Sequence, residues 1–278
     1  MATYPSVRSQ EISDRTGVIS WLALLPAHRR PVLAKTPLLI ALGVYLAGGR
    51  LETRPVLLTM ALATALWAVL YALNESTDLQ QESGILVGRR VQALLFLLPV
   101  LICLAAACLS PHLGLLFALM TVGQIAYSAP PWRVKRWWWA ILLLSGVLNP
   151  ILRLECGALW GPRAVPFLAY AVLVSLHLGS AIRARTLLKE RDRRLAYVAA
   201  PNGIGWLGIA CTVGGLIGAG FLCVQGFLPH ALLVFLLPAA LFSLYAWSGR
   251  IRSMAQLRQG WLGFAILSLL ALAVLLSR

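Results

Sequence analysis

Apolar runs of about the length needed to cross a lipid bilayer recur along the whole chain, and they exclude most other architectures. A helix needs about 20 residues to cross the hydrocarbon core of a membrane, and residues 55–74, 91–109 and 204–224 are such runs. The chain has 278 residues, of which 60% are hydrophobic and only 12% are charged. Typical soluble domains have about 25% charged residues. We therefore predict an all-α integral membrane protein with no separate soluble domain.

The apolar runs predict a bundle of nine transmembrane helices. They are expected at residues 33–49, 55–74, 91–109, 112–128, 137–152, 165–182, 204–224, 229–248 and 260–277. Several are shorter than 20 residues, so we expect tilting or local thinning of the membrane. Residues 1–32 are predicted to form a cytoplasmic N-terminal tail, with a short interfacial helix in "GVISWLALLPAHRR". The tail does not have the pattern of a signal peptide. Residues 33–278 are predicted to form the membrane domain.

Basic residues alternate between the two ends of the predicted helices. With a cytoplasmic N-terminus, all but five of the 24 Lys and Arg residues fall on the cytoplasmic side. The five are Arg50, Arg54, Arg153, Arg163 and Arg278. Because cytoplasmic loops are enriched in Lys and Arg, this distribution favours an N-in, C-out topology. The net charge of +15 is then explained by orientation and anionic lipid, and no nucleic-acid partner is expected. We expect a multi-pass protein of a bacterial plasma membrane.

Acidic residues gather in the stretch "ALNESTDLQQE", residues 72–82, although the whole chain has only nine. Asn74, Asp78 and Glu82 are spaced by four, so on a helix each is rotated by about 40° from the one before. All three therefore lie on one stripe, with Glu75 beside it. Carboxylate and amide oxygens are the ligands that Mg²⁺ prefers, and no thiol or imidazole for zinc lies nearby. The stretch predicts a magnesium site.

The acidic stretch also has a simpler interpretation. A charged helix end is often only a solvated face, and here it could pair with Arg89 and Arg90. However, Asn74 begins the stripe inside an apolar helix, where polar groups are costly and tend to be functional. This position favours the metal site.

Three segments resemble motifs of the UbiA superfamily of intramembrane prenyltransferases. "NESTDLQQE" resembles its first Asp-rich motif, NDxxDxxxD, and "YSAPPWRVKR", residues 127–136, resembles the YSxPPxRxKR segment. "DRRLAYVAAP", residues 192–201, is similar to the DRxxGxRTLP stretch that closes the second Asp-rich motif. With the nine predicted helices and the positions of the loops, the resemblance covers nearly the whole chain.

The chain departs from both Asp-rich motifs. Glu75 and Glu82 replace Asp in the first motif, which keeps oxygen ligands with a longer reach. In the second motif, Leu188 stands where the first Asp is expected, while Asp192 is retained. The resemblance therefore does not extend to a complete second metal site. The basic residues of this loop could instead neutralise part of a diphosphate's charge, or they could be only part of the positive-inside pattern.

The resemblance implies roles for individual residues. It implies catalytic roles for Asn74, Asp78, Glu82 and Asp192. It implies Mg²⁺ ligands among Asn74, Glu75, Asp78, Glu82, Glu190 and Asp192. It implies contacts with a substrate diphosphate from Arg89, Arg90, Tyr127, Arg133, Lys135, Arg136, Arg185 and Lys189.

The resemblance also implies a helical bundle with a lipid-accessible cavity, whose mouth faces the cytoplasm. An isoprenyl diphosphate would place its diphosphate at the mouth and its chain among apolar helices. The leading hypothesis is a Mg²⁺-dependent transfer of the prenyl group to an acceptor, expected to be an aromatic or quinone-precursor ring. Aromatic faces stabilise cations, so Trp67, Tyr71, Tyr127 and Tyr170 are candidates to stabilise an allylic carbocation.

Two other hypotheses stay open. The first is a UbiA-type terpene cyclase that acts on farnesyl or geranylgeranyl diphosphate alone. The second is a protein without this activity, either an inactive paralogue or a lipid-binding or transport protein. Charged residues in the middle of the predicted helices are scarce, which speaks against a transport pathway.

Overall fold

The computed structural model consists of helices. It describes residues 33–83, 88–188, 198, 201–251 and 253–277. The predicted tail and interfacial helix, residues 1–32, lie outside the described residues. Within the described part no strand is present, and a single isolated bridge pairs Trp137 with Val198. The predicted all-α class is confirmed.

The helices lie at each of the predicted stretches within the described part of the chain. They are α3 (Lys35–Leu46), α4 (Arg54–Ser83), α5 (Arg89–Leu109), α6 (Pro111–Ser128), α7 (Trp138–Ile141), α8 (Asn149–Ala158), α9 (Phe167–Leu187), α11 (Ile204–Val224), α12 (Leu233–Trp247) and α13 (Met254–Leu276). Short 3₁₀ turns are formed by η1 (Val134–Arg136) and η3 (His230–Leu232), and η2 (Leu142–Leu148) is a π-helix.

Six of the described helical stretches are long and apolar enough to cross a membrane. They are Arg54–Asp78, Arg89–Leu109, Trp138–Ala158, Phe167–Leu187, Ile204–Val224 and His230–Trp247. Lys35–Leu46 and Ile266–Leu276 are shorter apolar helices. Leucines such as Leu97, Leu101 and Leu104 of α5 point outward and are at least half exposed, as expected of a surface that faces lipid. The chain is a multi-pass membrane protein, while nine crossings and their orientation stay predictions.

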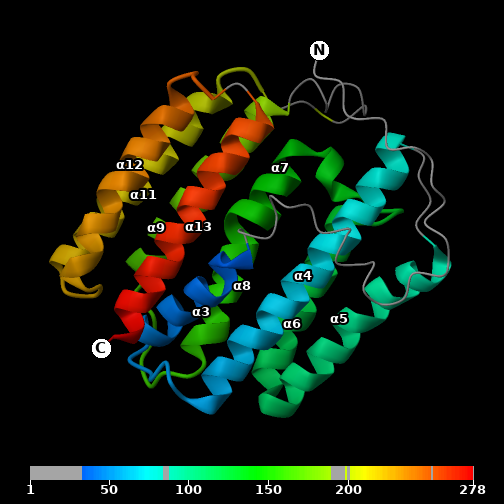
Figure 1. Ribbon diagram of the computed structural model, residues 1–278, viewed down its shortest axis with the longest axis horizontal. Helices are drawn as coiled ribbons and strands as arrows, with labels where there is room; N and C mark the ends of the chain where they lie inside the picture. Colours follow the sequence, from blue (N-terminus) through cyan, green and yellow to red (C-terminus); the bar gives the residue numbers. More distant parts are fainter. Residues whose placement is uncertain (1–32, 84–87, 189–197, 199–200, 252, 278) are drawn as a thin grey trace.

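The bundle is built around α3, α4, α6 and α8. Figure 1 shows these helices at the centre, with α5 at one edge and α11 and α12 at the other. Ile40, Leu66, Trp67 and Phe117 belong to one buried cluster, which joins α3, α4 and α6. A second cluster joins α3 and α8 to α9 and α11. The central helices are therefore packed on several sides.

Helices α3 and α8 approach each other closely through two glycines. A Cβ atom added at Gly157 would lie 1.9 Å from the carbonyl oxygen of Ile40, and one added at Gly43 would lie 2.1 Å from that of Leu154. Residue numbers rise together along this contact, since Ala47 meets Gly161 further on. The two helices therefore run parallel, with their backbones in direct contact.

Two helices extend further than the sequence predicts. Helix α4 continues to Ser83 instead of ending at residue 74, so the whole acidic stretch is helical. The fifth predicted helix runs on to Ala158, through the π-helix and a restart at Asn149–Pro150. Proline is tolerated in the first turn of a helix because its missing N–H would be unpaired there anyway. Arg153, predicted to lie in an outer loop, is consequently buried inside α8.

Candidate functional site

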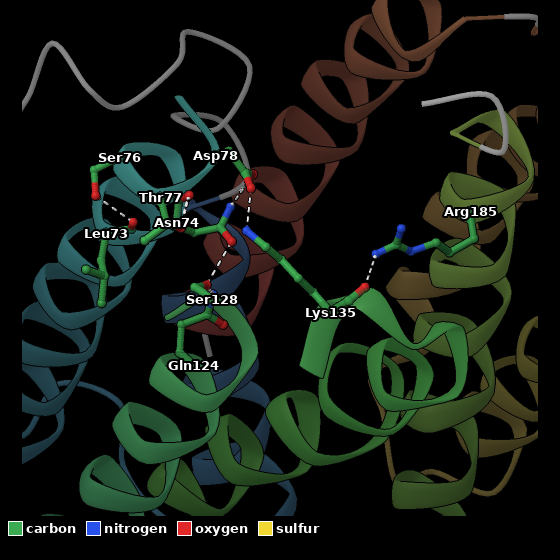
Figure 2. Close-up of polar contacts among 9 residues, drawn as sticks. All are labelled: Leu73, Asn74, Ser76, Thr77, Asp78, Gln124, Ser128, Lys135 and Arg185. Atoms are coloured by element: carbon green, nitrogen blue, oxygen red, sulfur yellow. Dashed lines mark hydrogen bonds and ion pairs between the residues drawn. The ribbon is translucent and has the colours of Figure 1, made fainter. Parts of the chain in front are cut away.

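The end of α4 carries a connected set of polar side chains inside the bundle (Figure 2). The amide nitrogen of Asn74 donates to Asp78 Oδ2 over 3.2 Å, one turn further along the helix. From α6, Ser128 Oγ donates to Asn74 Oδ1 over 2.8 Å. Gln124 Nε2 in turn donates to Ser128 Oγ over 3.2 Å. Both hydrogen-bonding ends of the Asn74 amide are thus fixed, and its side chain is almost fully buried.

Lys135 joins this set from the turn that follows α6. The turn η1 holds the Lys135 ammonium in an ion pair with Asp78 Oδ1. Only 4% of the Lys135 side chain is exposed, and 20% of that of Asp78. Each of these two little-exposed charges stabilises the other, because a buried charge without a partner is strongly unfavourable. Figure 2 shows Lys135 reaching from η1 towards the end of α4.

The backbone of the same turn contacts the second motif region. Arg185, near the end of α9, is buried and donates from Nη2 to the Lys135 carbonyl oxygen over 3.5 Å. The Val198 N–H donates to the Arg136 carbonyl oxygen over 2.8 Å. A pocket beside Arg185 is lined by Arg185, Thr186 and residues 201–205, which lead into the first turn of α11. The first Asp-rich motif, through Asp78, and the segment of the second, through Val198, are therefore both in contact with η1.

The donor atoms at this place fit a hard divalent cation. Asp78 offers a carboxylate, Asn74 an amide oxygen, and the half-buried Glu75 follows directly. The ammonium of Lys135 is paired with Asp78 Oδ1, so a cation that binds this carboxylate would have to share it with Lys135 or displace Lys135 from it. Among the described residues no group of three or more His, Cys, Asp or Glu side chains converges as a metal cage. Mg²⁺ does not require such a cage, since it keeps several waters and binds through one or two carboxylates.

Several predicted residues lie elsewhere. Arg89 and Arg90 are exposed in the first turn of α5, and neither makes an ion pair with a described residue. The simpler pairing of these arginines with the acidic stretch is therefore not found in the part of the chain described here. The guanidinium of Arg136 stacks on Trp137, 4.6 Å from the ring centroid.

Two further residues that were predicted to contact the diphosphate, Tyr127 and Arg133, are partly exposed. Tyr127 is half-buried near the end of α6. Arg133 has a φ of 37°, in the left-handed region, and its Nε is buried without a partner in the described structure.

Four of the predicted site residues are not placed. Lys189, Glu190 and Asp192 lie outside the described residues, as does the side chain of Glu82. Their roles as metal ligands or diphosphate contacts stay predictions.

The sequence analysis missed Ser128, Gln124 and Arg153. Ser128 lies inside the quoted "YSAPPWRVKR" segment, and Gln124 precedes it by one helical turn in an otherwise apolar helix. That spacing was the available signal, because polar side chains four residues apart share a helix face. Arg153 gave no such signal, since the predicted helix ended one residue before it.

Trp67, one of the aromatic candidates for stabilising a carbocation, already makes a cation–π contact. The guanidinium of Arg153 lies 3.7 Å from the centroid of the Trp67 ring, and the Trp67 and Tyr71 rings are 5.4 Å apart. Tyr170 donates its hydroxyl to Glu155. Trp67 therefore already has a cation on one face, which lowers its value for a second one.

Solved structures with the same arrangement of helices exist, although neither a protein-family model nor a curated protein matches the sequence. A UbiA homologue from Archaeoglobus fulgidus superposes with a TM-score of 0.68 and 16% identity, covering 93% of this chain and 100% of that one. The fold is that of UbiA. The same homologue solved with DMAPP and Mg²⁺ gives a TM-score of 0.67 and 16% identity, covering 93% and 99%.

A further structure with the UbiA fold is described as digeranylgeranylglyceryl phosphate synthase. It has a TM-score of 0.59 and 14% identity, and the match covers 94% of this chain and 99% of that one. At identities this low the likeness concerns the fold. The UbiA-like fold expected from the three motifs is thus confirmed over nearly the full length of the chain.

Proposed function

We propose that this protein is a Mg²⁺-dependent UbiA-type prenyltransferase, which ionises an isoprenyl diphosphate and transfers the prenyl group to an acceptor. The observation that carries the proposal is the buried set formed by Asn74, Asp78 and Lys135 at one end of a UbiA-like bundle. Ser128 fixes this set from a second helix. A related fold was solved with DMAPP, an isoprenyl diphosphate, and Mg²⁺, which supports the substrate class.

Asn74 and Asp78 would hold the metal ion. Glu75 directly follows Asn74 on α4, and Glu82 lies one helical turn after Asp78. When bound, Mg²⁺ supplies Lewis-acid stabilisation of the charge on the departing diphosphate. The chain itself fixes the direction of the ligands, because Ser128 and Gln124 hold the Asn74 amide in one orientation.

Lys135 would bind the diphosphate beside the metal. Its ammonium is the cation closest to Asp78 in the described structure, and a diphosphate carries several negative charges that need cationic partners in a partly desolvated place. Arg133 and Arg136 flank Lys135 in sequence, and Arg185 contacts the Lys135 carbonyl oxygen; these three arginines are proposed to contribute further contacts with the diphosphate. The exposed Arg89 and Arg90, and Lys189 in the second motif, are proposed to attract the substrate to the mouth.

The transfer balances without a redox partner. The bond between C1 of the prenyl group and its diphosphate oxygen breaks, and the electron pair leaves on the diphosphate. A nucleophilic carbon or oxygen of the acceptor forms a new bond to C1 and then loses a proton. The apolar faces of α4, α6 and α8 would exclude water, which would otherwise capture the carbocation.

Four further features of this function are proposed. The mouth is expected to face the cytoplasm, following the distribution of basic residues. The acceptor is expected to be aromatic. Glu190 and Asp192 would add ligands from the second motif, and the tail of residues 1–32 would lie on the same side of the membrane.

The substitution Asp78→Asn tests the proposal. Purified protein is incubated with Mg²⁺ and DMAPP, farnesyl diphosphate or geranylgeranyl diphosphate, with and without a hydroxylated aromatic acceptor, and diphosphate release is measured. We expect Asp78→Asn to lower Mg²⁺-dependent release by on the order of 100-fold or more. The matched control is Glu52→Gln, since Glu52 is an exposed acid paired only with Arg50, and it should keep the wild-type rate.

The products distinguish the remaining hypotheses. Release that needs an acceptor supports the transferase, and a cyclic hydrocarbon or terpene alcohol formed without one supports the cyclase. Wild-type release by Asp78→Asn would remove the metal assignment. If neither wild type nor any variant releases diphosphate, the protein is not an enzyme of this kind.

A further inference from the structure

A positively charged side chain is buried inside the bundle, below the candidate site. Only 5% of Arg153 is exposed. Its guanidinium stacks on Trp67, and Nη2 donates to the Tyr71 hydroxyl over a long 3.5 Å. No carboxylate forms an ion pair with Arg153 anywhere in the described part of the chain. A buried guanidinium without a counter-ion is unfavourable, because desolvation is not offset by an opposite charge.

Other polar atoms around Arg153 also have no partner. Arg153 Nε, Trp67 Nε1 and Thr36 Oγ1 are all buried, and none has a hydrogen-bond partner in the described structure. Buried donors are almost always paired, so several unpaired ones together call for an acceptor.

The packing of α3 on α8 brings Thr36 close to the level of Arg153. The two helices run parallel, with Gly157 between Ile40 and Val44 and with Gly43 between Leu154 and Ala158, so Thr36 lies within about one helical turn of the level of Arg153. Lys35 and His177 lie within electrostatic range of Arg153. Arg153 Nε and Trp67 Nε1 can only donate, and Arg153 and Lys35 are cations, so an anion is the partner that would satisfy both the donors and the charge.

This cluster lies on the same face of α4 as the candidate site. Trp67, Tyr71, Asn74 and Asp78 are spaced by four, three and four residues, which is one helical stripe. The rise from Trp67 to Asn74 is about 10 Å, at 1.5 Å per residue. Arg153 is therefore deeper in the bundle than the Asn74 and Asp78 pair, at a distance that suits a second molecule better than the diphosphate itself.

We propose that Arg153 binds an oxyanion, a carboxylate or a phosphate, on the acceptor that receives the prenyl group. The proposal rests on the proposed function. A guanidinium edge that includes Nε matches the two oxygens of such a group, and binding would pair the buried charge. The same charge disfavours a carbocation in this part of the bundle unless an anion is bound. The transferase reaction is therefore favoured over cyclisation.

Binding of matched probes tests the proposal without turnover. The purified full-length protein is placed in equilibrium dialysis with hydroxybenzoate or its uncharged methyl ester, and with phenyl phosphate or phenol. We expect at least one anion to bind tenfold or more tightly than its uncharged partner. The pair that shows the difference identifies the oxyanion as carboxylate or phosphate.

Variants then assign the effect to Arg153. Arg153→Gln should remove the preference for the anion, and Arg153→Lys should keep part of it because the charge remains. Arg163→Gln is the matched control, since Arg163 is exposed in the loop after α8, and its preference should equal that of the wild type. A thermal unfolding curve checks that each variant is folded.

Several outcomes would overturn the proposal. If the wild type binds ester and anion equally, which needs no variant, no oxyanion site exists. If Arg153→Gln keeps the preference, another residue makes it. If Arg153→Gln weakens binding of DMAPP as much as that of the anion, Arg153 belongs to the diphosphate.

The outcomes distinguish a failure of this inference from a failure of the proposed function. Diphosphate release that depends on Mg²⁺ and Asp78, without any preference for anions, leaves the proposed function in place and overturns the role of Arg153. Anion binding through Arg153 without diphosphate release under any condition overturns its role towards an acceptor and the proposed function together.

Discussion

Asn74 illustrates how a polar side chain inside an apolar helix is held by its neighbours. Its amide oxygen accepts from Ser128 and its amide nitrogen donates to Asp78. Ser128 is itself fully buried and receives a bond from Gln124. The position of one candidate ligand thus depends on a hydroxyl that has no predicted chemical role.

Substitution of Ser128 by Ala measures this dependence. The Asn74 amide would lose the donor that fixes its oxygen, a loss of about 1 to 1.5 kcal/mol for a buried hydrogen bond. We expect kcat for diphosphate release to fall about tenfold, with a higher Mg²⁺ requirement. Ser243→Ala is the control, since the Ser243 hydroxyl bonds only to a carbonyl of its own helix. Equal rates in both variants would show that Ser128 does not position Asn74.

The sequence identified the polar residues of the site, but it did not indicate how deeply they are buried or what surrounds them. Asn74, Asp78 and Lys135 were assigned from motifs and spacing, and the structure brings them together. The sequence could not indicate that Lys135 would be almost fully buried, because the burial of Lys135 depends on how η1 packs against α4. Arg153 was misplaced because the predicted helix ended at residue 152, whereas the observed helix continues to Ala158. That error in the boundary placed in a loop a charge that lies in the interior.

At the scale of helices, the contact between α3 and α8 determines the level at which Arg153 lies. The backbones touch at Gly43 and Gly157, where any side chain would meet a carbonyl oxygen of the other helix. The π-helix Leu142–Leu148 precedes α8 and sets its rotation before Asn149. Such π-helical turns often occur next to functional positions. A sequence alone gives little sign of them, since the residue types are those of any apolar helix.

Gly157→Ala tests the closeness of this contact. The added Cβ would lie 1.9 Å from the Ile40 oxygen, so the helices must separate, at a cost of about 1–3 kcal/mol or more. We expect a clear fall in Tm in detergent. Gly214→Ala is the matched control, because nothing lies within 4 Å of a Cβ at that glycine of α11, and Ala is favoured over Gly in a helix by about 0.5–1 kcal/mol. A Tm for Gly157→Ala equal to or above that of Gly214→Ala would contradict the close approach.

At the scale of the whole molecule, the order of the helices followed from the sequence because apolar runs and basic loops are strong signals. Their arrangement in space did not follow, since packing partners are chosen by the shapes of apolar faces. Six of the described stretches have the length and apolarity of membrane helices. Of the remaining predicted crossings, α3 has only 12 residues, while α13 has 23. The basic loops are the reason to expect α3, α6 and α13 to cross the membrane as well.

Reporter fusions test the predicted topology. With nine crossings and a cytoplasmic N-terminus, a reporter after Gly226 lies outside, one after Gly249 inside, and one after Arg278 outside. We expect alkaline phosphatase activity after Gly226 and Arg278, and green fluorescence only after Gly249. Fluorescence together with inactive phosphatase after Arg278 would indicate an even number of crossings.

The turn η1 touches two separated parts of the chain with different groups. The Lys135 side chain holds Asp78, while the carbonyl oxygens of Lys135 and Arg136 receive Arg185 and the Val198 N–H. A displacement of the η1 backbone would therefore change its contacts with Asp78, Arg185 and Val198 together. The turn η1 thus joins the end of α4 to the end of α9 and to Val198, so the positions of these three segments depend on one another.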